Sequence, residues 1–253
     1  MKTGWKNNIH TLGSRILNLI LPRYCAGCKK SNEAFCENCL ALSYKYGAHC
    51  LICGQRNNSG KICPEHLMGR LNILWAGRYD GALREAVRQL KYRKRKELAE
   101  PLANLLCKKF KEIYPKIKYE DCAVIPIPLH FKKEHERGFN QAELLARDFS
   151  QLSKVQLLTN ALIKIKETPA QVEVKDKEKR IKNLEGAFSV NLPPLNPLLI
   201  KEGKTGVVTI ILIDDVATTG ATLIHAARAL EKSGLPAGKA GVQKIIGLAV
   251  AHG

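Results

Sequence analysis

Apolar residues recur at helical spacing in three stretches of the chain, each with its apolar positions on one face. The first two begin behind Asp80, a residue type that caps helices, and near Leu98, and the third follows Gly220. A fourth helix is expected near Asn140. The apolar faces consist of Ala82, Leu83, Ala86, Val87 and Leu90, then Leu98, Leu102, Leu105 and Leu106, and finally Leu223, Ala226, Ala227 and Leu230.

Short runs rich in β-branched residues alternate with these helices and predict strands. We expect strands over 122–128, which two prolines terminate, and over 157–165, 206–213 and 245–251. The run 206–213 is the strongest, and the turn and helix behind it complete half of a βαβ unit. Alternating strands and helices predict an α/β fold. The remaining stretches are expected to be a charged loop over 130–137, a charged helix over 171–184 and a surface insertion over 235–242.

The N-terminal residues 1–24 have apolar positions at helical spacing and are expected to form a packing helix. A helix on a membrane surface is the alternative, because Trp5, Lys6 and Arg15 accompany the apolar stripe. No apolar run approaches the roughly 18 residues that a spanning helix needs. The stretch also lacks the features of a signal peptide, so we expect a cytoplasmic protein without membrane insertion.

Composition narrows the class of partner. The chain has 253 residues, of which 45% are hydrophobic, enough for one good core and a smaller appendage. Its 41 Lys and Arg residues against 23 Asp and Glu residues give a formal charge of +18. Such an excess favours nucleic acid or a phosphorylated small molecule, and it predicts that any DNA binding weakens steeply with salt.

The cysteines are concentrated near the N-terminus, since seven of nine precede residue 64 and stand in spaced pairs. This distribution is typical of metal binding rather than of disulfides. Two quartets are candidate structural zinc sites: Cys25, Cys28, Cys36 and Cys39, then Cys50, Cys53, Cys63 and His66. Thiolates also bind iron–sulfur clusters, but the histidine favours zinc. An interleaved pairing, in which the first pair joins Cys50 and Cys53, remains open.

A polar turn follows the strongest strand as Asp214-Asp215-Val216-Ala217-Thr218-Thr219-Gly220-Ala221-Thr222. Backbone N–H groups of residues 218–222 can converge on a phosphate at the N-terminus of the following helix, and the threonine hydroxyls add donors. Gly220 permits a tight turn. Asp214 and Asp215 stand where they can accept hydrogen bonds from the two hydroxyls of a ribose. A ribose 5-phosphate would satisfy both halves of this motif.

The segment 208–222 resembles the signature of type I phosphoribosyltransferases almost position by position. Nearly the whole chain resembles the ComF family, through the cysteine quartets, Ile125-Pro126-Ile127-Pro128, Arg137-Gly138-Phe139-Asn140-Gln141 and the acidic turn. The segment between these motifs also fits, with Pro169-x-Gln171 and Arg180-x2-Asn183-x2-Gly186-x-Phe188. The chain departs from the family pattern at Lys166, where an arginine is usual, at His66 and in the insertion.

The resemblance implies a Rossmann-like parallel sheet with helices, preceded by a small zinc-ribbon domain. It predicts an N-terminal helix over 1–24, a double zinc ribbon over 25–70 and a phosphoribosyltransferase-like domain over 71–253. The implied function is DNA uptake in natural transformation, with binding of phosphoribosyl pyrophosphate, Mg²⁺ and single-stranded DNA. The implied protein partners are a DNA-translocating ATPase and a DNA-processing protein.

In that reading Asp214 and Asp215 hold the ribose and are the catalytic candidates, and residues Ala217 to Thr222 hold the 5-phosphate. Arg137 and Lys91 are candidates for the pyrophosphate, although Arg137 could equally be a solvated loop charge. A binding module without turnover is the second hypothesis, in which the basic stretches 91–96 and 132–137 bind DNA. Tyr92 and Phe139 could then stack on bases or lie in the core. A nucleotide-salvage transferase is the third.

Overall fold

The structure is a computed structural model that describes residues 24–30, 32–45, 48–49, 56–57, 71–167, 184–191, 208–233 and 242–253. Three expectations fall wholly or almost wholly outside these residues. They are the N-terminal helix over 1–24, the charged helix over 171–184 and the insertion over 235–242.

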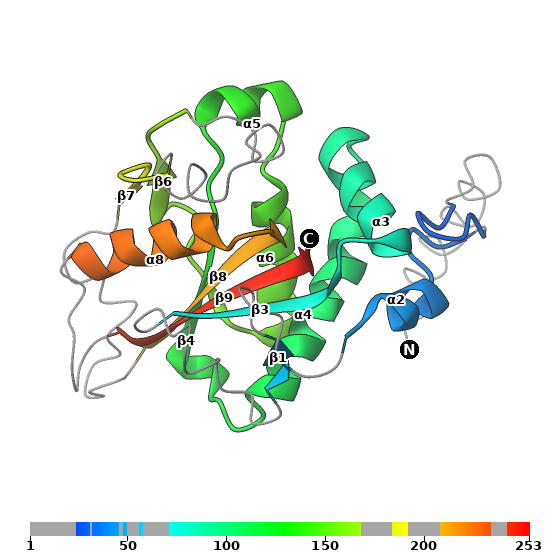
Figure 1. The fold of residues 1–253 in the computed structure, drawn as a ribbon, viewed down its shortest axis with the longest axis horizontal. Helices are drawn as coiled ribbons and strands as arrows, with labels where there is room; N and C mark the ends of the chain where they lie inside the picture. The colour runs from blue at the N-terminus through cyan, green and yellow to red at the C-terminus, as the bar shows by residue number, and fades with distance from the viewer. Residues whose placement is uncertain are drawn as a thin grey trace, which may run out of the picture.

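A five-stranded sheet forms the centre of the molecule (Figure 1). Its order is β3-β9-β8-β4-β5, and all four pairings between neighbouring strands are parallel. The strands are β3 (Leu71–Arg78), β4 (Cys122–Pro126), β5 (Gln156–Leu157), β8 (Val208–Ala217) and β9 (Val242–His252). The sheet confirms the predicted α/β class, because parallel neighbours need crossover connections, and helices supply them here.

Helices cover both faces of this sheet (Figure 1). Their apolar stripes pack into two buried clusters, one on each face. One face carries α3 (Gly81–Tyr92), α4 (Ala99–Ile113) and α6 (Gln141–Ser153), and the other carries α8 (Ala221–Lys232). The expected helices behind Asp80 and Asn140 are confirmed, with both residues at the N-cap.

Smaller elements complete the described fold. A hairpin of β6 (Leu162–Lys164) and β7 (Phe188–Val190) joins the cluster on the α8 face. The other elements are α2 (Glu37–Ser43), α5 (Phe131–Arg137), a short antiparallel pair of β1 (Ala48–His49) and β2 (Arg56–Asn57), and 3₁₀ turns at Lys96–Leu98 and Tyr119–Asp121. Within the described ranges, no helix combines the length and the apolar character needed to cross a membrane.

Three sequence-based expectations were incomplete or wrong. Strand β3 was not predicted, because its apolar run is buried with little alternation, and such a run does not distinguish a strand from a helix. The segment 130–137 contains helix α5 rather than a loop. This helix buries none of its residues and so has no apolar stripe to reveal it. The run 157–165 forms two short strands, of which β5 joins the main sheet and β6 the hairpin.

The cysteine-bearing segment packs directly on the core. Lys109 of α4 is fully buried and donates a hydrogen bond to the backbone carbonyl of Lys45. Its Nζ lies 3.4 Å from the Glu112 carboxylate and 4.6 Å from the centre of the Tyr44 ring. The Tyr44 hydroxyl donates to the same carboxylate. These contacts fix the end of the segment to α4, while the boundaries 25–70 and 71–253 remain a prediction.

Candidate functional site

The turn after β8 stands at the point where the topology of the sheet reverses. Strands β4 and β8 are neighbours, yet the chain leaves β4 toward α6 on one face and leaves β8 toward α8 on the other. In open parallel sheets, ligands bind beyond the carboxyl ends of the strands at such a switch point. The expected phosphate motif therefore lies where this fold class binds its ligands.

The turn itself is short and begins a helix. Strand β8 ends at Ala217 and α8 begins at Ala221, with Gly220 at the N-cap in the left-handed region at φ 72°. This conformation strains residues that carry a Cβ, so Gly220 is required as expected. The hydroxyl of Thr219 accepts a hydrogen bond of 3.3 Å from the Ala221 N–H. The first turn of α8 leaves backbone N–H groups without intrahelical partners, and its dipole favours an anion there.

Asp214 and Asp215 belong to the last residues of β8, which ends at Ala217, and not to the turn that follows it. Both are nearly buried, with 9% and 3% of their surface exposed. Because successive strand residues point to opposite faces, the two carboxylates emerge on different sides of the sheet. Each accepts a hydrogen bond of 2.8 Å from the next backbone N–H, Asp214 from Asp215 and Asp215 from Val216.

Lys91 of α3 forms an ion pair with Asp215 of β8. Its Nζ lies 2.6 Å from Oδ2 of Asp215, and both side chains are largely buried. Burial lowers the pKa of Lys91, but the charge of Asp215, its hydrogen bond and the charge of Asp214 together outweigh burial and raise that pKa. Burial, followed by the charge of Asp215, raises the pKa of Asp214 from 3.8 to about 7, and Lys91 opposes this rise. Lys91 thus balances the charge of Asp215, whereas the pKa of Asp214 lies near neutral pH.

Arg137 lies beside the end of α3 that carries Lys91. Its guanidinium carbon is 5.5 Å from the centre of the Tyr92 ring, and its Nη1 donates to Gln141 at 3.0 Å. Tyr92 itself is exposed. The structure therefore places Arg137 next to Tyr92, which follows Lys91 in the chain, although Arg137 and Lys91 are 46 positions apart in the sequence.

The residues that follow Arg137 shape the backbone between β4 and α6. Gly138 ends α5 in the left-handed region at φ 76°. Asn140 caps α6 by accepting from the Ala142 N–H and donates to the Ile127 carbonyl at 3.0 Å. Phe139 is buried in the core, which decides between its two expected roles. The motif thus positions Arg137 instead of offering Phe139 to bases.

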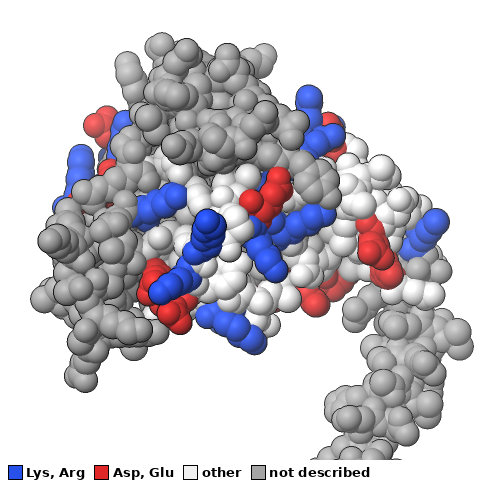
Figure 2. Space-filling model, turned by 90° about the horizontal axis from the view of Figure 1, so that it is seen from below, with Lys and Arg blue, Asp and Glu red and all other residues white. Residues whose placement is uncertain are grey.

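The basic run 91–96 is less free than its sequence suggests. Lys91 is paired, Arg95 contacts Glu97 at 2.7 Å, and Lys96 lies over the Phe139 ring at 5.1 Å. On the face in Figure 2, where described residues are visible, basic side chains are spread among neutral and acidic ones rather than gathered in one patch. The net charge is therefore distributed over this part of the surface.

Four cysteines form a candidate metal centre. The Sγ atoms of Cys25, Cys28, Cys36 and Cys39 all lie within 4.8 Å of one another, and those of Cys28 and Cys36 are 3.6 Å apart. Tetrahedral zinc with bonds of about 2.3 Å would hold its sulfurs roughly 3.8 Å apart. The donor set therefore fits zinc, and this quartet assembles from consecutive pairs. Cys50, Cys53, Cys63 and His66 lie outside the described residues.

Local backbone geometry supports this centre. Burial raises the pKa of the Cys25 thiol, but backbone N–H donors, above all that of Cys36, outweigh burial and lower it to about 6. Burial and the neighbouring cysteines raise the pKa of Cys39 to about 12. A side chain at Gly27 would come within 2.6 Å of Ala82, so a glycine is needed where the cluster meets α3. The local hydrogen bonds thus favour the thiolate of Cys25, and a bound cation would favour that of Cys39.

The pairing of Lys91 with Asp215 was not predicted from the sequence. A signal existed, because Lys91 stands four residues after Val87 and one after Leu90, on the edge of an apolar helical face. A charge in that position requires a buried partner. Only the tertiary fold, which brings Lys91 of α3 to Asp215 of β8, reveals which acid it is.

Comparison with known proteins places the chain among relatives of similar length. It is 28% identical to "Competence protein F" of Haemophilus influenzae over 231 residues, which cover 90% of this chain and 91% of the relative. It is 26% identical to "DNA utilization protein YhgH" of Escherichia coli over 80% of this chain and 91% of the relative. No family model matches the chain.

A third relative, "Competence protein ComFC" of Bacillus subtilis, is 30% identical over 217 residues. The match covers 81% of both chains. Identity at this level over most of both sequences shows common descent, and with the expected α/β fold it confirms the resemblance. The chain belongs to the ComF family.

Proposed function

We propose that this chain acts in DNA uptake on the cytoplasmic side of the membrane, where it binds phosphoribosyl pyrophosphate and single-stranded DNA. The relatives are named for competence and DNA utilization, which supports the DNA half of the proposal. The resemblance of the family motifs extends the proposal to two protein partners, a DNA-translocating ATPase and a DNA-processing protein.

The observation that carries the phosphoribosyl half is the turn at the topological switch point. It combines a left-handed glycine, the N-terminus of α8 and two nearly buried acids in one short segment. A buried acidic pair is costly without a ligand or a counter-charge, and Lys91 balances only one of the two. Ribose hydroxyls would donate to Asp214 and Asp215, and the 5-phosphate would accept from the turn over residues 217–222.

Two metal ions have separate roles in this proposal. Zinc in the first cysteine quartet would have a structural role and would stabilise the N-terminal segment, since four protein ligands leave no position for a substrate. Mg²⁺, bound together with phosphoribosyl pyrophosphate, would neutralise part of the negative charge of the pyrophosphate. Lys91 and Arg137 remain candidates for the pyrophosphate, and Arg137 is favoured because Lys91 is paired with the Asp215 carboxylate, whereas Arg137 contacts the neutral Tyr92 and Gln141.

The DNA half rests on charge and on one exposed aromatic side chain. Tyr92 is exposed and has the Arg137 guanidinium over its ring, a combination on which a base can stack. Because the rest of the run 91–96 is partly engaged, phosphates would be held by cations of several elements. Binding should therefore weaken steeply as salt rises.

Calorimetric titration of the zinc-loaded protein with phosphoribosyl pyrophosphate and Mg²⁺ tests the proposal. We expect binding by the wild type and its loss in an Asp214→Asn, Asp215→Asn double variant. Asp80→Asn is the matched control, because Asp80 is an exposed acid at the N-cap of α3 and makes no side-chain cap. Absence of binding by the wild type would refute the phosphoribosyl half and leave the DNA half standing.

A second candidate is phosphoribosyl transfer itself. Asp214, with a pKa of about 7, can exchange a proton near neutral pH, which an acceptor that loses a proton would require. In such a reaction the bond from the anomeric carbon to pyrophosphate breaks as a bond to the acceptor forms. Release of pyrophosphate with a nucleobase or DNA acceptor would favour this candidate over pure binding.

A further inference from the structure

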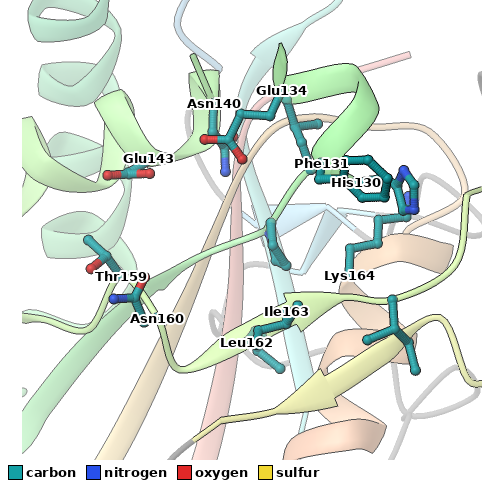
Figure 3. A pocket seen from close by; sticks show the side chains of 13 residues that line it. His130, Phe131, Glu134, Asn140, Glu143, Thr159, Asn160, Leu162, Ile163 and Lys164 are labelled. Carbon is teal, nitrogen blue, oxygen red and sulfur yellow. The ribbon is translucent and has the colours of Figure 1, made fainter. Parts of the chain in front are cut away.

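A cavity of about 460 Å³ lies between helix α5 and strand β6, beyond the carboxyl ends of β4 and β5 (Figure 3). This volume is within the range of sites that bind small molecules or single bases. None of residues 214–222 lines it, so it is separate from the phosphate turn. The function proposed above does not use this cavity.

Exposed apolar side chains surround the cavity. Phe131, Ile163 and Ile165 line it with 69%, 44% and 57% of their surface exposed. Seven large apolar side chains are exposed among the described residues, and these are three of them. Their clustering around one hollow indicates a ligand with a flat apolar face.

Apart from Lys164, the polar groups that line the cavity suit a neutral ligand with donors and acceptors. Glu134 and Asn140 lie on one side of it, and Asn160 and Thr159 lie below Glu143 at the other end (Figure 3). Amide and hydroxyl groups can pair with the edge of a base. The two carboxylates can accept from its amino groups, and they would repel a phosphate placed inside the cavity.

One buried polar atom at the cavity lacks a protein partner. His130 is 6% exposed, and within the described part of the chain its Nδ1 has no hydrogen-bond partner. Its ring packs on that of Phe131, with the centroids 4.5 Å apart. A buried nitrogen of this kind is unfavourable unless a ligand or water reaches it.

Three lysines lie in or next in sequence to the lining of the cavity, and of these Lys164 lines it. Lys132 and Lys133 follow Phe131 on α5, and Lys164 belongs to β6. Burial, and then the charge of Lys133, lowers the pKa of Lys164, so these cations repel one another. The pair between Lys132 and Glu167 is exposed and holds the lysine only weakly. A phosphate at the rim would relieve the repulsion.

We propose that this cavity receives one unpaired base of single-stranded DNA, stacked on Phe131, while Lys132, Lys133 and Lys164 hold the flanking phosphates. The inference rests on the proposed DNA-binding function and adds a second position for a base to the one proposed at Tyr92. A free nucleobase would use the cavity but not the cations, and a base within a duplex cannot leave its stack without a cost. An unpaired base in a strand uses both.

Fluorescence anisotropy with a short single-stranded oligonucleotide, and with an abasic strand of equal length, tests the proposal. Phe131→Ala should weaken binding of the normal strand by about 5- to 150-fold, as expected for the loss of one stacked base. It should leave binding of the abasic strand unchanged. Phe131 is exposed, so the variant should fold, and binding of phosphoribosyl pyrophosphate serves as the check. Leu152→Ala, which removes an exposed apolar side chain at the end of α6, should bind as the wild type does.

A second variant addresses the rim. Replacing Lys132 and Lys133 with glutamine should reduce the slope of log affinity against log salt by about 1.4, the value for two lost phosphate contacts on a single strand. The slope of Phe131→Ala should equal that of the wild type. Equal loss of slope in both variants would contradict the division between base and phosphates.

The other outcomes separate the two proposals. If Phe131→Ala binds the normal strand as tightly as the wild type does, the cavity does not hold a base, although the DNA function stands. If free nucleoside monophosphates bind as tightly as the strand and depend on Phe131, the cavity is a small-molecule site and the assignment to DNA is overturned. If the wild type binds no single strand, both the DNA function and this inference fail.

Discussion

The cysteine cluster and the acidic pair of β8 both bring groups that can carry negative charge close together, but they differ in how that charge is balanced. Asp215 has Lys91 at 2.6 Å, so much of its countercharge is part of the chain. The contacts that lower the pKa of Cys25 are hydrogen bonds from three backbone N–H groups and from the Cys36 side chain, and none of them is a positive charge. The charge of Asp215 is thus balanced within the chain, whereas a positive charge at the cysteine site would have to come from a bound metal ion.

The largest effect should come from breaking the metal centre. Cys39→Ser should lose one equivalent of zinc and lower the melting temperature by at least about 10 °C, because structural zinc contributes many kcal/mol to small folds. Metal analysis and thermal unfolding measure both. Cys107→Ser, which changes a cysteine outside the cluster, should keep its zinc. Full zinc content in Cys39→Ser would show that the cluster is not a metal site.

An intermediate effect should come from breaking the pair between Lys91 and Asp215. Lys91→Met leaves a buried carboxylate without its partner and should destabilise the protein by about 3–5 kcal/mol in urea unfolding. The double variant Lys91→Met, Asp215→Leu should recover most of that stability, since an apolar pair replaces the ionic one. Lys232→Met, at the exposed end of α8, should change little. A double variant as unstable as Lys91→Met would mean that the pair is not what balances Asp215.

The smallest effect concerns the acid that Lys91 does not pair. Because the pKa of Asp214 rises from 3.8 to about 7 on folding, the folded state binds more protons than the unfolded chain between these values. Stability should therefore fall as pH rises through this window, and the cost is complete above pH 7. Asp214→Asn should be more stable than the wild type by about 2–4 kcal/mol at pH 8, with the difference much reduced near pH 4.

Urea unfolding at several pH values measures this difference. Asp80→Asn, a change at an exposed acid, should follow the wild type at every pH. A constant difference between Asp214→Asn and the wild type across this pH range would show that Asp214 does not carry its proton to near neutral pH.

The sequence predicted those parts of the fold that have a local signal. Helices α3, α4 and α8 bury one face each, so their apolar periodicity was sufficient, and α6 was expected only from its start near Asn140. The turn from Asp214 to Thr222 was recognisable because each of its residue types has a local reason, above all Gly220 in the left-handed region.

Other parts depend on contacts between distant segments. Helix α5 lacks an apolar stripe, and β3 is buried with little alternation, so neither had a decisive periodicity. The countercharge of Asp215 comes from α3, more than 120 positions earlier in the chain. The cavity beside Phe131 combines residues of α5, α6 and β6. Only the tertiary fold brings these together.

The contacts of the buried Lys109 side chain with Lys45, Tyr44 and Glu112 affect how segments of this fold can be exchanged. Segments held by generic apolar packing can be exchanged between related chains, because many residues of similar volume fit. A fully buried ammonium group fits one arrangement of acceptors and would be left uncompensated in another. A chimera that receives residues 24–45 from a relative would therefore need the α4 of that relative as well. The unit of exchange is larger than the cysteine-bearing segment.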